Sequence, residues 1–108
     1  MKFKTDPEAL ILGALAEGPL HGYAIVKTIK ESSQGVFKLS EGQLYPLLHR
    51  MLAKGWVSAE WETPVNGPAR KTYLLLESGR KELEERKRDW KLFADAVGGL
   101  LITEGGNA

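Results

Sequence analysis

Apolar residues recur at helical spacing in the first third of the chain, in two short stretches separated by turn residues. Asp6-Pro7 is a typical helix start, because aspartate caps a helix and proline fits its first turn. An apolar face follows and stops at Gly18-Pro19. A second helical pattern begins near His21 or Gly22 and ends around residues 32–35. The spacing predicts two short helices in this part of the chain.

A third amphipathic pattern begins at Ser40, ends at Gly55 and continues into two extended segments. Its apolar positions recur as on one face of a helix and are Leu44, Leu47, Leu48, Met51 and Leu52. Residues 56–61 and 70–75 then have the composition of strands, and the turn-rich segment 63–68 joins them. A short helix that leads into a hairpin is the DNA-contacting part of a winged helix-turn-helix. The predicted fold is therefore mainly α (α+β), a winged helix-turn-helix with a two-stranded β-wing.

The last helical pattern, from Ser78 to about Leu101, has a different period. Its apolar residues form two series spaced seven apart, Leu83, Trp90 and Val97 in one, Phe93 and Leu100 in the other. A seven-residue repeat is typical of a helix that pairs with another helix, so these five residues are the predicted interface of a long dimerisation helix. Arg86 interrupts the repeat, because it stands seven residues before Phe93.

We divide the chain into a winged helix-turn-helix unit at residues 1–77, a dimerisation helix at 78–102 and a frayed tail at 103–108. A chain of 108 residues can form one hydrophobic core. Chains of this size bury roughly 60–70% of their unfolded surface, which leaves little spare stability. Dimerisation would add to that stability.

The composition excludes several classes of function. The chain has no cysteine, which excludes disulfides, thiolate zinc sites and cysteine nucleophiles and fits a reducing cytoplasm. His21 and His49 stand outside any carboxylate pattern and no phosphate-binding glycine loop is present, so we predict no metal, no cofactor and no enzymatic activity. No apolar run reaches about 18 residues, the length of a membrane span. The first seven residues lack the apolar region of a signal peptide. We therefore predict a cytoplasmic protein with no membrane partner.

The positions of the charges, more than the net charge of +1, bear on DNA binding. Basic residues dominate from position 21 to 55, and acidic residues follow mainly after position 76, where they alternate with basic ones. On the third helix the outward positions are Gly42, Gln43, Pro46, His49, Arg50 and Ala53, with Tyr45 at the border. Gln43 can pair with adenine, and Arg50 can reach guanine or a phosphate. His49 is a candidate for phosphate or solvent contact, and Pro46 predicts a kink or a late helix start.

Arg70-Lys71 opens the return strand of the wing and is well placed to grip a phosphate backbone. Two plainer interpretations remain open at this point. The outward positions of the third helix could be an ordinary exposed face, and Arg70-Lys71 could be a charged edge that resists aggregation.

Several of these segments together resemble the PadR family of transcriptional regulators. The matching segments are Leu12-Gly13-Ala14-Leu15, His21-Gly22-Tyr23, the stretch 39–51 (LSEGQLYPLLHRM), Gly55-Trp56-Val57, Arg70-Lys71-Thr72-Tyr73 and the stretch 77–83 (ESGRKEL). Their order and spacing are more specific than any one of them alone. The resemblance spans roughly residues 7–95 and is to the shorter subgroup, which has one C-terminal helix.

The resemblance implies a bacterial or archaeal homodimeric repressor that binds double-stranded DNA. Carried over to matching positions, the DNA-facing residues are Tyr23, Ser40, Gln43, Tyr45, Pro46, Arg50, Arg70 and Lys71, while Tyr73 is expected to pack the wing against the body. Members of the family often release DNA when a small aromatic compound binds near the dimer interface. The residues that could line such a site are Leu10, Ala14, Trp90 and Phe93. For Trp90 we favour the simpler role of filling the dimer core.

Two residues depart from the family pattern. Leu76 stands where a threonine often caps the last helix, so the cap is expected to move to Ser78. Glu41 stands where a neutral residue is common, and it would repel a phosphate unless the helix N-terminus holds its charge aside. The alternative function is a winged-helix module that binds a protein partner and not DNA. The two functions differ in whether Arg50, Arg70 and Lys71 form one positive surface.

Overall fold

The elements of the chain follow the order that the sequence predicts, with one short strand added. The computed structural model describes residues 5–102, so residues 103–108, predicted to be a frayed tail, lie outside the described part. The elements are α1 (Pro7–Ala14), β1 (Leu20–His21), α2 (Gly22–Ser32), α3 (Glu41–Ala53), β2 (Val57–Glu62), β3 (Arg70–Leu75) and α4 (Glu77–Leu101). This is a mainly α winged helix-turn-helix with a long last helix, as predicted.

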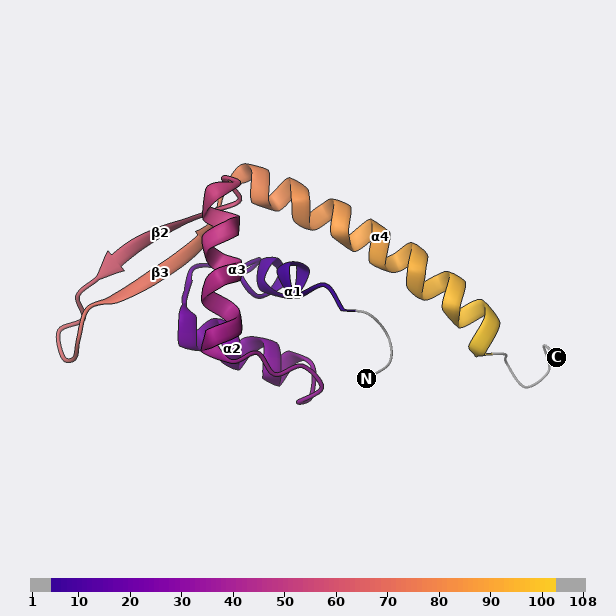
Figure 1. Ribbon diagram of the computed structural model, residues 1–108, viewed down its shortest axis with the longest axis horizontal. Coiled ribbons are helices and arrows are strands. Elements are labelled where there is room, and N and C mark those ends of the chain that lie inside the picture. The colour runs from indigo at the N-terminus through magenta and orange to yellow at the C-terminus, as the bar shows by residue number, and fades with distance from the viewer. Residues whose placement is uncertain (1–4, 103–108) are drawn as a thin grey trace.

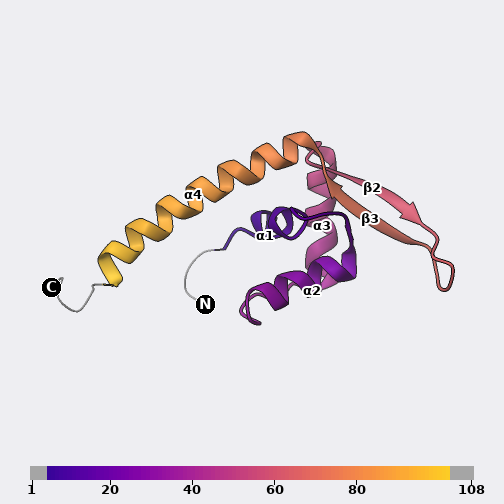
Figure 2. The same cartoon turned by 180° about the vertical axis from the view of Figure 1, so that it is seen from behind.

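The molecule is elongated because two elements project from a small helical body in opposite directions. Helices α1, α2 and α3 form the body, the β2–β3 wing extends to one side, and α4 extends to the other (Figure 1). The view from behind shows the same arrangement (Figure 2). The principal dimensions of 60 × 27 × 22 Å follow from these two projections.

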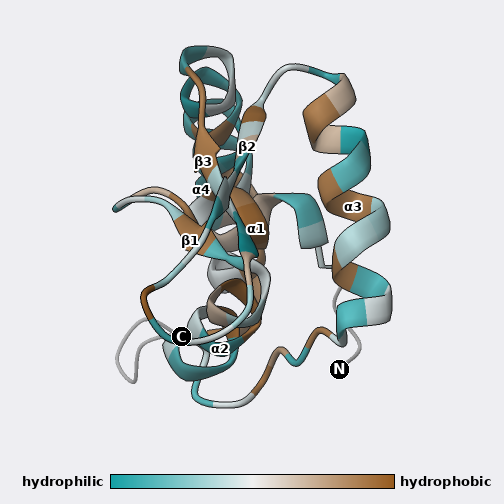
Figure 3. Cartoon of the chain, turned by 90° about the vertical axis from the view of Figure 1, so that its left-hand side faces the viewer, coloured by the Kyte–Doolittle hydropathy of each residue, from teal (hydrophilic) through white to brown (hydrophobic). Residues whose placement is uncertain are grey.

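The hydrophobic core joins all three helices of the body to the base of the wing and the start of α4. Its fully buried side chains are Ile11, Leu12, Leu15, Ile25, Leu44, Leu48, Met51 and Val57. Hydrophobic and hydrophilic residues alternate along α3, as Figure 3 shows by colour. Burying one such aliphatic side chain contributes about 1.5–3 kcal/mol, so the predicted apolar face of α3 is a main source of stability.

The sheet has three antiparallel strands in the order β1-β3-β2. In the wing, Val57 pairs with Leu75 and Glu62 pairs with Arg70. On the other edge of β3, Leu20 pairs with Tyr73 and His21 with Thr72. Strand β1 was not predicted, since a strand of two residues has no periodicity to detect.

Of the two outcomes expected from Pro46, the late helix start does not occur, because Pro46 lies inside α3, which begins at Glu41. One expectation about a helix cap was wrong. Ser78 does not cap α4, which begins at Glu77 with Leu76 at the cap position and no side-chain cap bond. The hydroxyl of Ser78 donates instead to the carbonyl oxygen of Gly55, and so ties the first turn of α4 to the end of α3.

Candidate nucleic-acid interface

A groove lies between the N-termini of α2 and α3 and the wing. The residues that line it are His21, Gly22, Tyr23, Glu41, Tyr45, Trp61, Ala69, Arg70, Lys71 and Tyr73. Four of the predicted DNA-facing residues, Tyr23, Tyr45, Arg70 and Lys71, are thereby brought together from three separate parts of the sequence. Two cations and several hydroxyl groups on one surface are suited to hold phosphate oxygens.

The side chain of Tyr45 depends on a glycine in the neighbouring helix. A Cβ atom added at Gly22 would collide with the hydroxyl and ring of Tyr45, so any larger residue there would force the end of the Tyr45 side chain to shift. Tyr45 is 39% exposed there and offers its hydroxyl to the groove. Burial, followed by the proximity of Tyr45, raises the pKa of Tyr73, which packs the wing against the body as expected.

His21 has a structural role at the start of α2. Its Nδ1 accepts a hydrogen bond from the Ala24 amide at 3.3 Å, so the proton of the neutral ring resides on Nε2. The ring also stacks against Tyr23, with the ring centroids 6.4 Å apart. His21 and Tyr23 thus lie together at the groove, a contact that no sequence pattern indicates.

The N-terminus of α3 is closed by a reciprocal capping box. The Gln43 amide donates to Ser40 Oγ at 3.2 Å, and the Ser40 amide donates to Gln43 Oε1 at 2.9 Å. The carbonyl end of the Gln43 side chain is thus engaged within the helix start. A bidentate contact of Gln43 with adenine would require the hydrogen bond between the Ser40 amide and Gln43 Oε1 to break. The side-chain nitrogen of Gln43 is therefore the more accessible group for DNA.

On the wing, both candidate cations have cross-strand partners. Arg70 forms an ion pair of 3.8 Å with Glu62, its partner in the ladder. The ammonium group of Lys71 lies 5.6 Å from the ring centroid of Trp61, which is also its ladder partner. Trp61 is 69% exposed and lines the groove, yet the sequence analysis did not select it. Only the strand register, which depends on the length of the wing loop, brings it beside Lys71.

The remaining candidates on α3 are exposed but lie outside the groove. Pro46, His49 and Arg50 are all solvent-exposed, as predicted for the outward face. Arg50 lies in the last turn of α3, nine residues after Glu41, which corresponds to about 13 Å along the helix axis. Arg50 therefore does not line the groove with Arg70 and Lys71, and Glu41 adds an acidic group to the groove.

The predicted dimer helix exposes most of its apolar residues in the single subunit. Trp90 is 62% exposed, Phe93 44% and Leu100 83%, and the rings of Trp90 and Phe93 contact each other with centroids 5.8 Å apart. Leu83 differs, because it is buried in the core of its own subunit. Val97 is half-buried. Of the predicted effector-site residues on α1, Leu10 and Ala14 both pack against the core.

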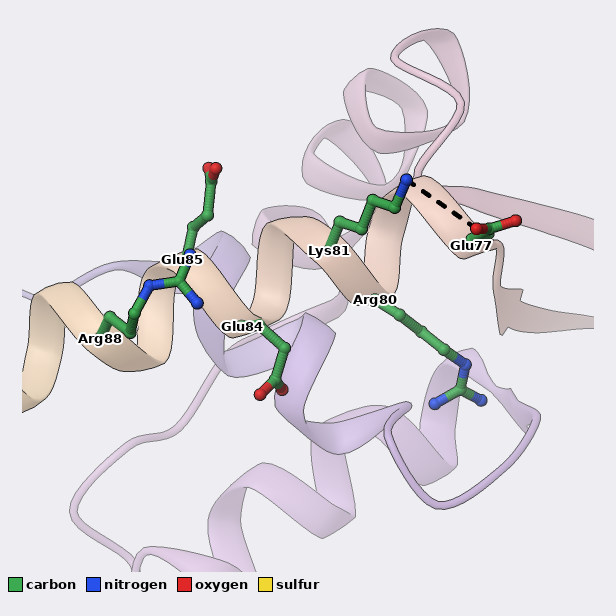
Figure 4. Close-up of a pocket in the computed structure, with 6 residues that line it drawn as sticks. All are labelled: Glu77, Arg80, Lys81, Glu84, Glu85 and Arg88. Carbon is green, nitrogen blue, oxygen red and sulfur yellow. Dashed lines mark ion pairs between the residues drawn. The ribbon is translucent and has the colours of Figure 1, made fainter.

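Other kinds of site have little support within residues 5–102. No group of three or more histidine or acidic residues there could hold a metal ion. None of the helices in this range has the length and apolarity to cross a membrane. A shallow depression on α4 is lined by charged residues of both signs from this helix alone, among them Arg80, Lys81 and Glu84 (Figure 4). Among the lining residues, Lys81 forms an ion pair with Glu77 at 3.8 Å.

The fold and the groove together define a winged helix-turn-helix protein of the kind that regulates transcription. A model of the PadR-like family of transcriptional regulators matches residues 11–85. The chain belongs to this family and is a DNA-binding transcriptional regulator, not an enzyme.

Similar proteins of known sequence or structure agree with this assignment. Transcriptional regulator Rv3488 of Mycobacterium tuberculosis is 34% identical over 96 residues, which cover 88% of this chain and 86% of that protein. A PadR-like transcriptional regulator from Bacillus cereus is 30% identical with a TM-score of 0.78, covering 91% of this chain and 93% of the other. Bacillus subtilis PadR in complex with operator DNA is 29% identical with a TM-score of 0.67. This match covers 73% of the present chain but only 45% of the other.

Proposed function

We propose that the protein is a homodimeric repressor that binds a pseudo-palindromic operator through two copies of the groove described above. The observation that carries this proposal is the convergence of Tyr23, Tyr45, Arg70 and Lys71 beside the N-terminus of α3. A related protein, the negative transcriptional regulator PadR of Bacillus subtilis, is 32% identical over 77 residues. The name of that relative favours repression over activation.

In the proposed complex, α3 enters the major groove and the wing contacts the flanking backbone or minor groove. Arg70 and Lys71 neutralise phosphates, and the hydroxyls of Tyr23 and Tyr45 donate to phosphate oxygens. Pro46, His49 and Arg50 face the DNA further along α3. Ser40 and Gln43 stand at the start of α3, where the helix N-terminus also attracts a phosphate.

The two subunits would pair through α4. Trp90, Phe93, Val97 and Leu100 supply the apolar surface that a partner helix would cover, with Leu83 at the edge next to the core. Twofold pairing sets two recognition helices about 34–36 Å apart, one turn of DNA. This separation is what makes the expected operator a pseudo-palindrome.

A flat apolar effector would relieve repression by binding beside the same helix. Trp90 and Phe93 form an aromatic pair there, and Leu10 and Ala14 lie on α1. Because a tryptophan at a helix interface needs no ligand to explain it, this part of the proposal is secondary. It is tested only after DNA binding has been measured.

The experiment that tests the proposal is a mobility-shift titration of the purified protein on the DNA upstream of its own gene. The wild type is compared with the double variant Arg70→Ala/Lys71→Ala at several salt concentrations. Each neutralised phosphate contributes about 0.9 to the slope of log affinity against log salt, so the variant is expected to reduce that slope by about 2.

The matched control is Lys81→Ala/Lys87→Ala, which removes two exposed cations of α4 and keeps the groove intact. It is expected to bind as the wild type does. Equal binding by wild type and the Arg70/Lys71 variant would contradict the role of the wing. Binding of the upstream DNA no better than random DNA, at every salt concentration, would favour a protein partner in place of an operator.

A further inference from the structure

Arg86, which interrupts the apolar repeat of α4, forms its hydrogen bonds within its own subunit. Arg86 donates to both carboxylate oxygens of Asp6 at 2.8 and 2.7 Å, and to Glu82 at 2.7 Å. A weaker contact of 3.4 Å reaches Glu8. Its side chain is only 21% exposed. Arg86 thus replaces an apolar interface residue with a partly buried ionic contact to the start of α1.

The same cluster includes the end of α3 and the start of the wing. The guanidinium of Arg86 lies 5.3 Å from the ring centroid of Trp56, and the ammonium group of Lys54 lies 4.5 Å from the same ring. Lys54 also pairs with Glu8 at 3.7 Å. One cluster therefore joins α4 to the N-terminus of α1 and to the turn between α3 and β2.

The contacts of Arg86 depend strongly on orientation, because they are hydrogen bonds between charged groups. Burial disfavours the guanidinium charge, but the hydrogen bonds to Glu82 and Asp6 outweigh this cost and raise the pKa of Arg86 above its usual value. A planar guanidinium that bonds two carboxylates fixes an orientation, whereas aliphatic contacts allow small rotations at little cost.

Arg86 also occupies the point where α4 leaves the body. Among the described residues, its ion pairs are the furthest along α4 that reach another element; those of Lys87 and Lys91 remain within the helix. The C-terminal half of α4 extends well beyond α1 in both views of the ribbon (Figures 1 and 2). A small rotation at Arg86 would therefore be amplified along the rest of the helix.

We propose that Arg86 is a positioning residue that fixes the direction of α4 relative to the winged-helix unit, and thereby the separation of the two recognition helices in a dimer. This inference rests on the proposed homodimer. It assigns the specificity for operator spacing to a residue whose hydrogen bonds lie within its own subunit. The carboxylates of Asp6 and Glu82 act with it.

The test measures the distance between the two recognition helices directly. Since the chain has no cysteine, the substitution Ala53→Cys at the exposed end of α3 introduces a single spin-label site per subunit. Double electron–electron resonance on the labelled protein is expected to give one narrow distance distribution. In the Arg86→Met background, which keeps the aliphatic bulk and removes the ion pairs, the distribution is expected to become about twofold broader, as for a released hinge.

The matched control is Lys81→Met, because Lys81 lies on the same helix and its ion pair is with the exposed Glu77 of that helix. It is expected to keep the narrow distribution. Sedimentation velocity run on each sample verifies that the variants are still dimers, so that a broader distribution reflects orientation and not dissociation.

If Arg86→Met does not fold, Asp6→Asn decides, because asparagine still caps α1 through its oxygen but loses the charged contact with Arg86. Narrow and unchanged distributions in the Arg86 or Asp6 variant would overturn the positioning role and leave the proposed homodimer intact. An absence of any dipolar coupling in the otherwise wild-type protein would overturn the homodimer itself, and this inference with it.

Discussion

Residues in and beside the groove make several different kinds of structural contact. Gly22 provides space for the ring of Tyr45, His21 caps α2 and stacks on Tyr23, and Gln43 closes the start of α3. These residues belong to the segments that resemble the PadR family. The structure gives a physical reason for each of them that does not involve DNA. The same residues therefore stabilise the local structure around the groove, apart from any role in binding DNA.

Tyr73 makes a prediction about stability at alkaline pH. Burial raises the pKa of its phenol above the usual value of 10.0, so folding favours the neutral form. The stabilisation from this residue is fully present below pH 10 and is lost as the pH rises through the folded-state pKa. The free energy of unfolding, measured by urea titration from pH 8 upward, is expected to fall less steeply above pH 10 for Tyr73→Phe than for the wild type.

Comparing wild type and variant at each pH cancels the contributions of other groups that titrate there, such as Lys91, whose pKa its contact with Asp95 raises. Tyr23→Phe at an exposed position serves as the control and should keep the wild-type dependence. Parallel curves for wild type and Tyr73→Phe would show that the phenol stays accessible in the folded protein.

At the scale of elements, the start of α4 is packed directly against the turn that precedes the wing. A Cβ atom at Gly79 would collide with the carbonyl oxygen of Trp56, which already accepts a hydrogen bond of 2.9 Å from the Leu76 amide. We therefore expect Gly79→Ala to lower the free energy of unfolding by about 1–3 kcal/mol, because a close backbone contact must shift.

The comparison for this measurement is Gly13→Ala in α1, where nothing lies within 4 Å of the added Cβ. That variant is expected to raise the free energy of unfolding by about 0.5–1 kcal/mol, since alanine is the better helix former. Both values come from urea unfolding under the same conditions. Equal effects of the two substitutions would mean that α4 adjusts without cost at its first turn.

At the scale of the whole molecule, α4 projects from the body, so that much of its apolar surface is exposed in the single subunit. Trp90→Asp places a charge in the middle of this surface, and burying an unpaired charge is costly. The variant is expected to be monomeric at micromolar concentrations, where the proposal makes the wild type a dimer, and to weaken operator binding by at least about tenfold. Analytical ultracentrifugation and mobility shifts measure the two effects.

Leu92→Asp is the matched control, because Leu92 is 73% exposed on the same helix and lies outside the seven-residue series. It should leave the dimer intact. A dimeric Trp90→Asp variant with unchanged DNA binding would contradict α4 as the interface. A monomer that still binds the operator as tightly as the wild type would contradict the link between pairing and recognition.

The sequence by itself determined the order of the elements, the apolar face of α3, the wing and the interrupted repeat of α4, because these depend on local periodicity and turn residues. Only the tertiary structure decided which groups the cations Arg70, Lys71 and Arg86 contact. The strand register pairs Arg70 with Glu62 and Lys71 with Trp61, and the fold brings Asp6 to Arg86 across 80 positions of sequence. The first two contacts depend on strand register and the third joins distant parts of the chain, so no local periodicity encodes them.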